Sequence, residues 1–279
     1  MALSIHTNYS SLVTQTNLNK TNNALGNNQQ RLGTGLRINS AADDAAGLQI
    51  ATRLNAQSRG MEVAMRNTGD AISLLQTAEG AFNEMTDIMQ RMKDLATQAA
   101  NDTNSDDDRT ALQAEYDELG KELTNIIDNT KYAGEALFAA AGKFTASMTF
   151  QIGASSSETL ALDASGGLTD VTDAITIIKG ETLDDSTNAG TAIDELETAL
   201  DAVGTMRATL GANINRLNHT ANNLANMKDN TDMSKGRIMD ADFAKESANM
   251  SKNSMLMQSG ISMLKQAGQM PGMVMSLLG

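Results

Sequence analysis

The 279-residue chain contains no cysteine, one proline, two histidines and only 3% aromatic residues. The absence of cysteine excludes a disulfide framework, a thiol nucleophile and a thiolate metal site. The histidines add little, because His6 has no Asp or Ser beside it and His219 lies in NRLNHTANN, on the polar face of an expected helix. We therefore expect no enzymatic activity, no cofactor and no metal, whereas the scarcity of proline permits long helices.

Long apolar runs are missing as well. Nowhere do about eighteen apolar residues follow one another, as a membrane-spanning helix requires. The start, MALSIHTNYS, lacks the basic region and the continuous apolar region of a secretory signal peptide. The sequence thus predicts neither a Sec-type precursor nor a membrane partner.

Negative charge is concentrated in the middle of the chain. The net charge of -13 is made up of +3 in residues 1–60, -18 in residues 61–232 and +2 in residues 233–279. A strongly acidic middle repels nucleic acid, whereas weakly charged ends can pack against other surfaces. We expect the ends to be interior, the middle to face water, and no nucleic acid to bind.

Three segments of the middle carry apolar or small residues at the 4-3 spacing of one helix face. The first is interrupted by Glu79, and the third is broken only at Arg207, where Met206 can substitute. The positions are Met61, Met65, Thr68, Ile72, Leu75, Phe82, Met89, Ala96 and Ala99; Leu112, Tyr116, Leu119, Leu123, Ile126 and Thr130; and Ile193, Leu196, Leu200, Val203, Leu210, Ile214, Leu217, Ala221 and Leu224. The spacing predicts a mainly α fold, a coiled-coil-like bundle of long helices.

Both ends of the chain also show apolar residues at seven-residue intervals. The N-terminal stripe is narrow, whereas further apolar residues widen the C-terminal stripe beyond a two-helix seam. The repeats are Leu18, Leu25 and Leu32, then Phe243, Met250, Met257 and Leu264, with Met255, Leu256, Ile261 and Met263 as the widening residues. We expect the two end helices to pair as a discontinuous terminal domain and to bury the remaining face against other copies of the chain. The many methionines of 250–275 favour adaptable helix packing.

One strand pattern interrupts the helical segments. Apolar and polar residues alternate in 148–152 and again in 160–162, on either side of the loop GASSSET. This alternation predicts a small β-hairpin near 145–165. The following segment, 163–190, is rich in Asp, Ser, Thr and Gly, and it is therefore expected to be irregular surface.

The stretch QRLGTGLRINSAADDAAGLQIA contains two glycines that suggest a phosphate-binding loop. Gly33 and Gly35 begin a dinucleotide fingerprint, but Ile38 replaces its third glycine, and no Lys followed by Ser or Thr completes a Walker loop. The residues favour a bend, in which the glycines end one helix and Ser40, with Asp43 and Asp44, caps the next.

Side chains with oxygen ligands alternate at Asp102, Asn104, Asp106 and Asp108 and suggest a calcium loop. The pattern fails at two positions, because Asp107 stands where the turn needs glycine and Gln113 where a bidentate Glu belongs. Acids at the positive end of a following helix are the favoured interpretation.

The same stretch at 30–51 closely resembles the most recognisable motif of bacterial flagellins. MALSIHTNYSSLVTQTNLNK, MQRMKDLATQAANDTNS, MRATLGANINRL, GRIMDADFAKESANMSKNSML and the ending MSLLG resemble flagellin in the right order, over approximately 1–140 and 200–279. The resemblance implies a filament subunit whose terminal helices, 1–40 and 233–279, form an inner tube, while 41–232 forms the outer tube. The residues implied as the connection between these layers are Gly33, Gly35, Arg37, Asn39, Asp43 and Asp44. The chain is short for the family, and no separate outer domain is expected.

The resemblance also implies partners and a location. The chain would polymerise with itself, bind a flagellar secretion chaperone through its C-terminal helix, and meet the filament cap and hook-filament junction proteins. It would be exported through the flagellar type III apparatus without a cleaved signal peptide and would lie outside the cell. A host Toll-like receptor would contact the positions matching Gln90, Arg91, Leu95, Gln98 and Glu115, and plant receptor kinases would sense the segment 30–51. Arg91 and Leu95 are expected at the border of the helix seam or outside it.

Other classes of protein are open at this point. A hook-filament junction protein has similar terminal helices, although the length and the intact 30–51 motif favour flagellin. A coiled-coil scaffold and an enzyme with a buried active site are the alternatives outside the flagellar apparatus. Polymerisation of the purified chain would discriminate against both.

Overall fold

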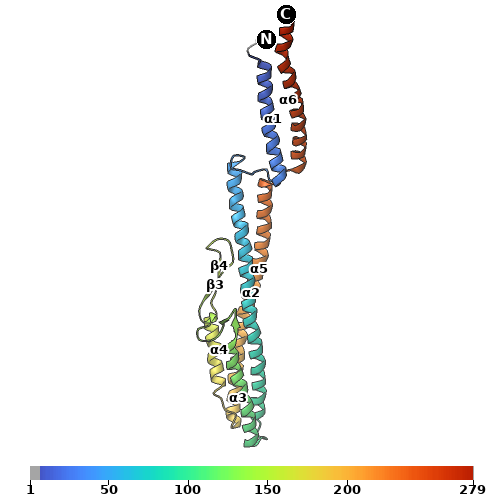
Figure 1. Cartoon of the computed structure of the whole chain (residues 1–279). Helices are drawn as coiled ribbons and strands as arrows, with labels where there is room; N and C mark the ends of the chain where they lie inside the picture. Colours follow the sequence, from blue (N-terminus) through green and yellow to red (C-terminus); the bar gives the residue numbers. More distant parts are fainter. Residues whose placement is uncertain (1–6, 279) are drawn as a thin grey trace. The chain divides into compact units, whose positions relative to one another are not determined.

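The computed structural model describes residues 7–278, except for the side chains of residues 270, 271 and 273–278. Long helices dominate it (Figure 1), which confirms the predicted fold class. The helices are α1 (Tyr9–Thr34), α2 (Ala45–Ala99), α3 (Asp106–Asn129), α4 (Ser165–Ile178), α5 (Ser186–Met239) and α6 (Phe243–Leu278), with a 3-10 turn, η1 (Lys143–Thr145). The strands are β1 (Lys131–Tyr132), β2 (Glu135–Ala136), β3 (Met148–Gln151) and β4 (Thr159–Leu162).

The chain divides into two compact units. The terminal unit comprises residues 1–56 and 230–279, and the central unit comprises residues 57–229. The terminal unit is discontinuous in sequence, as the fold class predicted. The assignment of 1–40, 41–232 and 233–279 to the layers of a filament stays a prediction.

In the central unit, α2, α3 and α5 lie side by side (Figure 1) and bury one continuous apolar core. Phe82 and Met89 of α2 and Leu210 of α5 are fully enclosed. The predicted helical stripes are confirmed, and Met206 is buried where Arg207 interrupts the third stripe. Buried positions recur every three or four residues along each helix, which is the pattern of coiled-coil-like packing.

The prediction for residues 163–190 was wrong in one respect. Much of this segment forms α4, and Leu168, Val171, Ile175 and Ile178 are buried in the same core. These four residues have the 3-4-3 spacing of a helix face, which the many Gly, Ser, Thr and Asp residues around them obscured. Residues 163–190 therefore include a fourth helix of the central bundle.

Two antiparallel hairpins accompany the helices, where the sequence predicted one. The predicted hairpin is present, with Met148 opposite Leu162 and Phe150 opposite Leu160 in β3 and β4. The additional hairpin, β1–β2, turns through Ala133 and Gly134, whose φ angles are 51° and 87°. Positive φ at both central residues is typical of a type I′ turn.

The terminal unit contains the pair formed by α1 and α6 (Figure 1), as predicted from their seven-residue repeats. The helices approach closely where Gly260 faces Leu18, because a Cβ at position 260 would lie 3.1 Å from Leu18 Cδ1. Among the described residues, no helix has the length and apolarity needed to cross a membrane.

Candidate assembly interface

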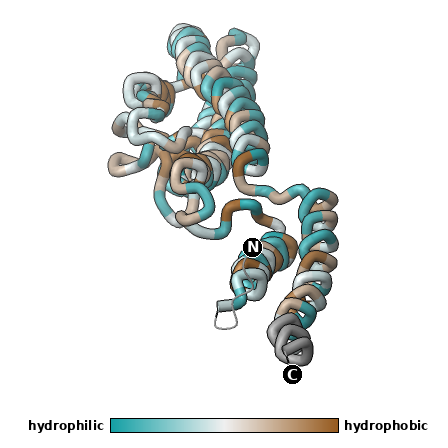
Figure 2. The backbone as a smooth tube through the Cα atoms, turned by 90° about the horizontal axis from the view of Figure 1, so that it is seen from above, coloured by the Kyte–Doolittle hydropathy of each residue, from teal (hydrophilic) through white to brown (hydrophobic). Residues whose placement is uncertain are grey.

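The terminal helices leave many apolar side chains uncovered. The predicted packing residues Leu18, Leu25, Leu32, Met250, Met257 and Leu264 are only partly buried, and Phe243 is 58% exposed. Further large apolar side chains are exposed on α1 and α6: Tyr9, Leu12, Val13, Met255, Leu256, Ile261 and Met263. Figure 2 shows hydrophobic positions along both helices. Because two helices cover only one stripe of each other, the remaining faces form the uncovered apolar surface of the terminal unit.

A partly buried ion pair joins α1 to α6. Arg31 Nη1 lies 3.2 Å from Glu246 Oε1, and Glu246 is only 7% exposed. The second carboxylate oxygen, Oε2, is buried without a hydrogen-bond partner. With its amide oriented to satisfy both groups, Asn28 donates to Ala24 O and accepts from Met250 N, at 2.7 and 3.2 Å. Buried polar contacts of this kind favour one register of a helix pair over others.

The segment between α1 and α2 begins with a glycine cap. Gly35 follows α1 with a φ of 72°, and its N–H donates to Arg31 O, whereas Gly33 lies within the last turn of α1. The left-handed conformation favours glycine at position 35, because a Cβ would be strained there. The predicted helix end is confirmed, with Gly35 as the residue that caps it.

Backbone and side-chain contacts fix the same segment against the end of α5. Arg37 N donates to Met239 O at 2.6 Å, and the Arg37 guanidinium donates to Ile238 O. Asn39 donates through its side chain to Leu36 O, at 2.8 Å. Hydrogen bonds to the end of α5 and within the segment itself therefore hold the connection in place in the terminal unit.

The predicted cap of α2 is only partly as expected. Asp44 Oδ1 accepts from Gly47 N at 2.8 Å, so Asp44 caps the helix. Ser40 instead donates to Asp43, whose Oδ2 also accepts from Asn39 N at 3.0 Å. These backbone hydrogen bonds hold the pKa of Asp43 below its ordinary value.

The sequence pattern did not identify Ile38 and Gly47 as residues that shape this connection. Ile38 is almost fully buried, and a Cβ on Gly47 would lie 2.8 Å from Ile38 Cδ1 and 2.5 Å from Asp44 Oδ2. A side chain at position 47 would therefore displace the side chains of Asp44 and Ile38. An apolar residue between two polar bends was the sequence feature that could have identified Ile38.

The residues matched to a host receptor lie along α2 and α3. Arg91 donates from Nε and Nη2 to Glu115 Oε1, at 3.0 and 2.6 Å, and both side chains are about half exposed. Gln90 and Gln98 are exposed as well. Leu95 is only 1% exposed, so its expected place at the border of the seam was wrong. Helices pack on α2 from more than one side, and the buried stripe is therefore wider than a two-helix seam.

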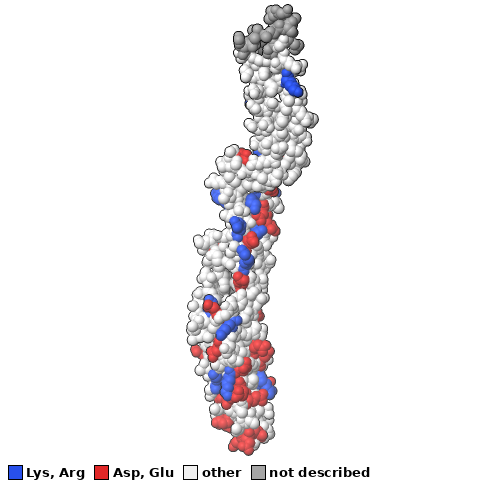
Figure 3. All heavy atoms as spheres, in the orientation of Figure 1, with Lys and Arg blue, Asp and Glu red and all other residues white. Residues whose placement is uncertain are grey.

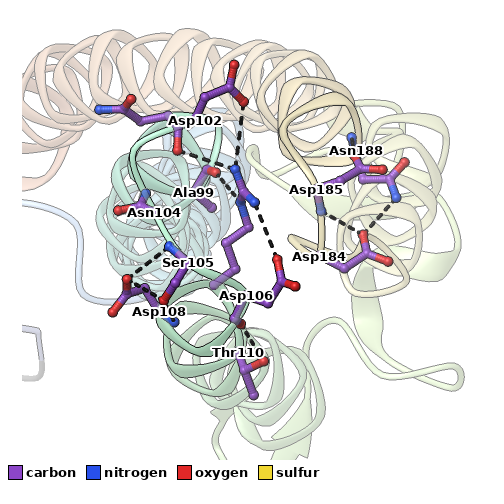
Figure 4. A network of polar contacts seen from close by, with 12 residues as sticks. Ala99, Asp102, Asn104, Ser105, Asp106, Asp108, Thr110, Asp184, Asp185 and Asn188 are labelled. Atoms are coloured by element: carbon purple, nitrogen blue, oxygen red, sulfur yellow. Dashed lines mark hydrogen bonds and ion pairs between the residues drawn. The ribbon is translucent and has the colours of Figure 1, made fainter.

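The turn between α2 and α3 is a helix start and not a calcium loop (Figure 4). Ser105 Oγ accepts from Asp108 N, while Asp108 Oδ2 accepts from Ser105 Oγ and Ser105 N. This capping box lowers the pKa of Asp108, mainly through the Ser105 hydroxyl. Arg109 Nε donates to Ala99 O at 3.0 Å and so caps the end of α2.

Figure 4 also shows the start of α5, where Asn188 donates hydrogen bonds to the carboxylates of Asp184 and Asp185. Across residues 7–278, no group of three or more His, Asp or Glu side chains is arranged to hold a metal ion. His219 is exposed on α5, and His6 lies outside the described residues. Asp108 and Asp185 accept backbone hydrogen bonds at the starts of α3 and α5 and so cap these helices.

The arrangement defines a class of protein: a long-helix structural subunit whose first and last helices pair and present an uncovered apolar surface. The bacterial flagellin N-terminal helical region matches residues 5–143, and the bacterial flagellin C-terminal helical region matches residues 193–278. The chain belongs to the bacterial flagellin family, a family of structural proteins, and is a subunit of the flagellar filament.

Individual relatives support this assignment over the whole chain. Polar flagellin C of Vibrio parahaemolyticus is 36% identical over 386 aligned residues that cover all of both chains, so it contains segments absent from this shorter chain. A flagellin of Halalkalibacterium halodurans is 41% identical over 262 residues, covering 94% of this chain and 93% of the relative.

Solved structures are similar as well. The crystal structure of Bacillus cereus flagellin has a TM-score of 0.50 and 35% identity, covering 57% of this chain and 88% of that one. The structure of a putative flagellar hook-associated protein from Vibrio parahaemolyticus has a TM-score of 0.57 at 14% identity, covering 71% of this chain and 100% of that one. The second similarity supports the fold alone.

Proposed function

We propose that the chain assembles into the filament by burying the uncovered apolar surface of α1 and α6 against neighbouring copies. The observation that carries this proposal is the exposure of large apolar side chains such as Tyr9, Met255 and Met263 on helices that already pair. The helices α1 and α6 would then each lie among several neighbours and form the inner tube of the filament. Residues 41–232 would form the outer tube.

Unlike surfaces on the two terminal helices would meet in successive copies. Heterologous contacts that do not close into a ring generate an open helical array, which is the geometry of a filament. The hydrogen-bonded connection at Gly35, Arg37, Asn39, Asp43 and Asp44 would link the two layers.

The same apolar surface would let accessory proteins bind the free chain. A flagellar secretion chaperone would cover α6 before export, and export would proceed through the flagellar type III apparatus without a cleaved signal peptide. The filament cap and hook-filament junction proteins would be the neighbours at the two ends of the polymer. The assembled chain would lie outside the cell.

Host sensing is a second proposed role. A Toll-like receptor would contact the exposed Gln90, Arg91, Gln98 and Glu115, which lie on neighbouring faces of α2 and α3. Leu95 would contribute from below this surface, by packing α2 and so holding Arg91 in place. Arg91 is the proposed anchor, because a guanidinium forms several oriented hydrogen bonds. Plant receptor kinases would sense 30–51, and free chain would activate the animal receptor more than filament does.

Seeded polymerisation tests the assembly proposal. Purified full chain is mixed with filament fragments, and growth is followed by electron microscopy and by limited proteolysis. We expect filaments to form and cleavage within 9–34 and 243–269 to be fast in the free chain and slow in the filament, because these segments become buried. Equal cleavage rates in free and assembled chain would contradict the proposed burial.

A further inference from the structure

Among the described residues, the methionine side chains range from fully buried to largely exposed. Methionines in the central unit are at most 1% exposed at five positions: Met61, Met85, Met89, Met92 and Met206. On α6, by contrast, Met255 and Met263 are 63% and 60% exposed. Reagents in water can therefore reach the thioethers of α6 while packing shields those of the core.

A peroxide converts such an exposed thioether into a polar group. Hydrogen peroxide transfers one oxygen atom to the methionine sulfur, so that an S–O bond forms, the O–O bond breaks and water is released. The sulfur loses two electrons, and the peroxide gains them. The resulting sulfoxide is polar and chiral. Burying it without a hydrogen-bond partner is unfavourable, in contrast to burying the original thioether.

Met255 and Met263 lie among other exposed apolar residues of α6. Leu256 and Met263 are seven residues apart and share one face, while Met255 is adjacent to Leu256 in the chain. All three side chains are exposed. A sulfoxide at either position would introduce a polar oxygen beside the exposed apolar side chains of α6.

We propose that Met255 and Met263 form a peroxide-sensitive modification site, at which sulfoxidation of the free chain blocks assembly. The inference rests on the proposed function, in which neighbouring copies bury this surface of α6. Once the surface is buried, the sulfurs are shielded, so the vulnerable form is the chain before assembly. Methionine sulfoxide reductases reverse the change.

The test uses purified full chain, dilute hydrogen peroxide and seeded polymerisation, with peptide mass spectrometry to locate the added oxygen. We expect oxygen at Met255 and Met263 and little at Met89 or Met206. The critical concentration should rise by about ten-fold or more, a factor equivalent to about 1.4 kcal/mol per subunit. Treatment with both reductases should restore it. Unchanged polymerisation of chain oxidised at both positions would overturn the proposal.

Variants provide matched controls. In M255L/M263L, peroxide should change the critical concentration little relative to the same variant before treatment, because leucine cannot form a sulfoxide. M227L should remain as sensitive as the unmodified chain, because Met227 is 38% exposed but lies on the part of α5 that belongs to the central unit. Equal inhibition of M255L/M263L and the unmodified chain would place the sensitive sulfur elsewhere and reject the assignment. Reversal by the reductases tests the modification site without any variant. Failure of the untreated chain to polymerise would instead reject the proposed function.

Discussion

The central and terminal units are both built from long helices, but they differ in how completely they bury their apolar side chains. In the central unit, four helices and the β3–β4 hairpin enclose residues such as Phe82, Met89 and Leu162. In the terminal unit, α1 and α6 cover one stripe of each other and leave Tyr9, Met255 and others in water. A helix with apolar residues around most of its circumference needs several neighbours, and a single partner cannot supply them.

The two units also differ in charge: the central unit carries many charged side chains, and α1 and α6 carry few. The face drawn in Figure 3 carries many Asp and Glu side chains over the central unit and few charges over the described part of α1 and α6. Charges resist desolvation, so a surface that is to be buried is expected to carry few. The low charge of α1 and α6 supports the proposal that neighbouring copies bury these helices, while the charged central unit faces water.

The largest expected effect comes from Leu264→Asp in the terminal unit. Leu264 is partly buried on α6, and a charge there would lack a partner in the assembled inner tube, at a cost of several kcal/mol per subunit. We expect no filaments in seeded polymerisation, with an unchanged melting temperature for the central unit. Ile177→Asp, on an exposed position of α4, is the matched control and should polymerise. Normal filaments from Leu264→Asp would show that α6 is not buried on assembly.

Phe82→Ala tests the central unit. Phe82 is fully buried, and its ring centroid lies 4.8 Å from that of Phe138. Removal of a buried ring should lower the free energy of unfolding by about 3–5 kcal/mol, through lost burial and the remaining cavity. Denaturant unfolding followed by circular dichroism measures it. A loss below about 1 kcal/mol would mean that this core is not tightly packed.

Glu246→Ala affects the register of the terminal helices. Arg31 would lose its partner, and removal of this charged hydrogen bond should weaken the α1–α6 pair by about 1–3 kcal/mol. The expected result is faster proteolysis of the terminal segments in the free chain, with little change in the central unit. Combining Glu246→Ala with Arg31→Ala should cost less than the sum of the single changes. Simple additivity would show that the two side chains do not act as a pair.

Ser105→Ala removes the cap of α3 and should cost about 1 kcal/mol. For a unit of this size, the melting temperature should fall by about 2–4 °C per kcal/mol. Ser156→Ala in the β3–β4 loop is the control. Because the pKa of Asp108 is lowered in the folded chain, its stabilisation is complete above the unfolded pKa and is lost as pH falls through the folded pKa. The unmodified chain should therefore lose more stability in acid than Ser105→Ala does.

Heptad periodicity predicted most of this fold, because apolar residues recur at the same short spacing along the whole length of a long packed helix. It identified the buried stripes of α2, α3 and α5 and the pairing of α1 with α6. It missed α4, since weak helix formers surround Leu168 and Val171, and it missed the two-residue strands of β1–β2, which are too short for alternation to be visible.

Contacts between distant residues were less accessible from the sequence. Arg31 and Glu246 are 215 positions apart, and no local pattern connects them. The burial of Leu95 depends on how many helices surround α2, which a single stripe does not specify. Site residues on helix surfaces could therefore be placed along an element, but not always on the correct face of it.

Arg91→Ala has the smallest expected effect on stability and separates a surface role from a structural one. The pair with Glu115 joins two half-exposed side chains, and exposed pairs of this kind contribute at most about 1 kcal/mol. The melting temperature of the central unit should therefore stay almost unchanged, while binding to the Toll-like receptor should weaken by about ten-fold or more if Arg91 is an anchor. Lys93→Ala, which breaks a comparable ion pair between α2 and Glu197 of α5, is the matched control and should leave receptor binding intact. Equal receptor binding by Arg91→Ala and the unmodified chain in a titration would reject the anchor. A clear fall in melting temperature would instead mean that Arg91 holds α2 and α3 together, and the exposed surface of the central unit would then contribute to its own folding.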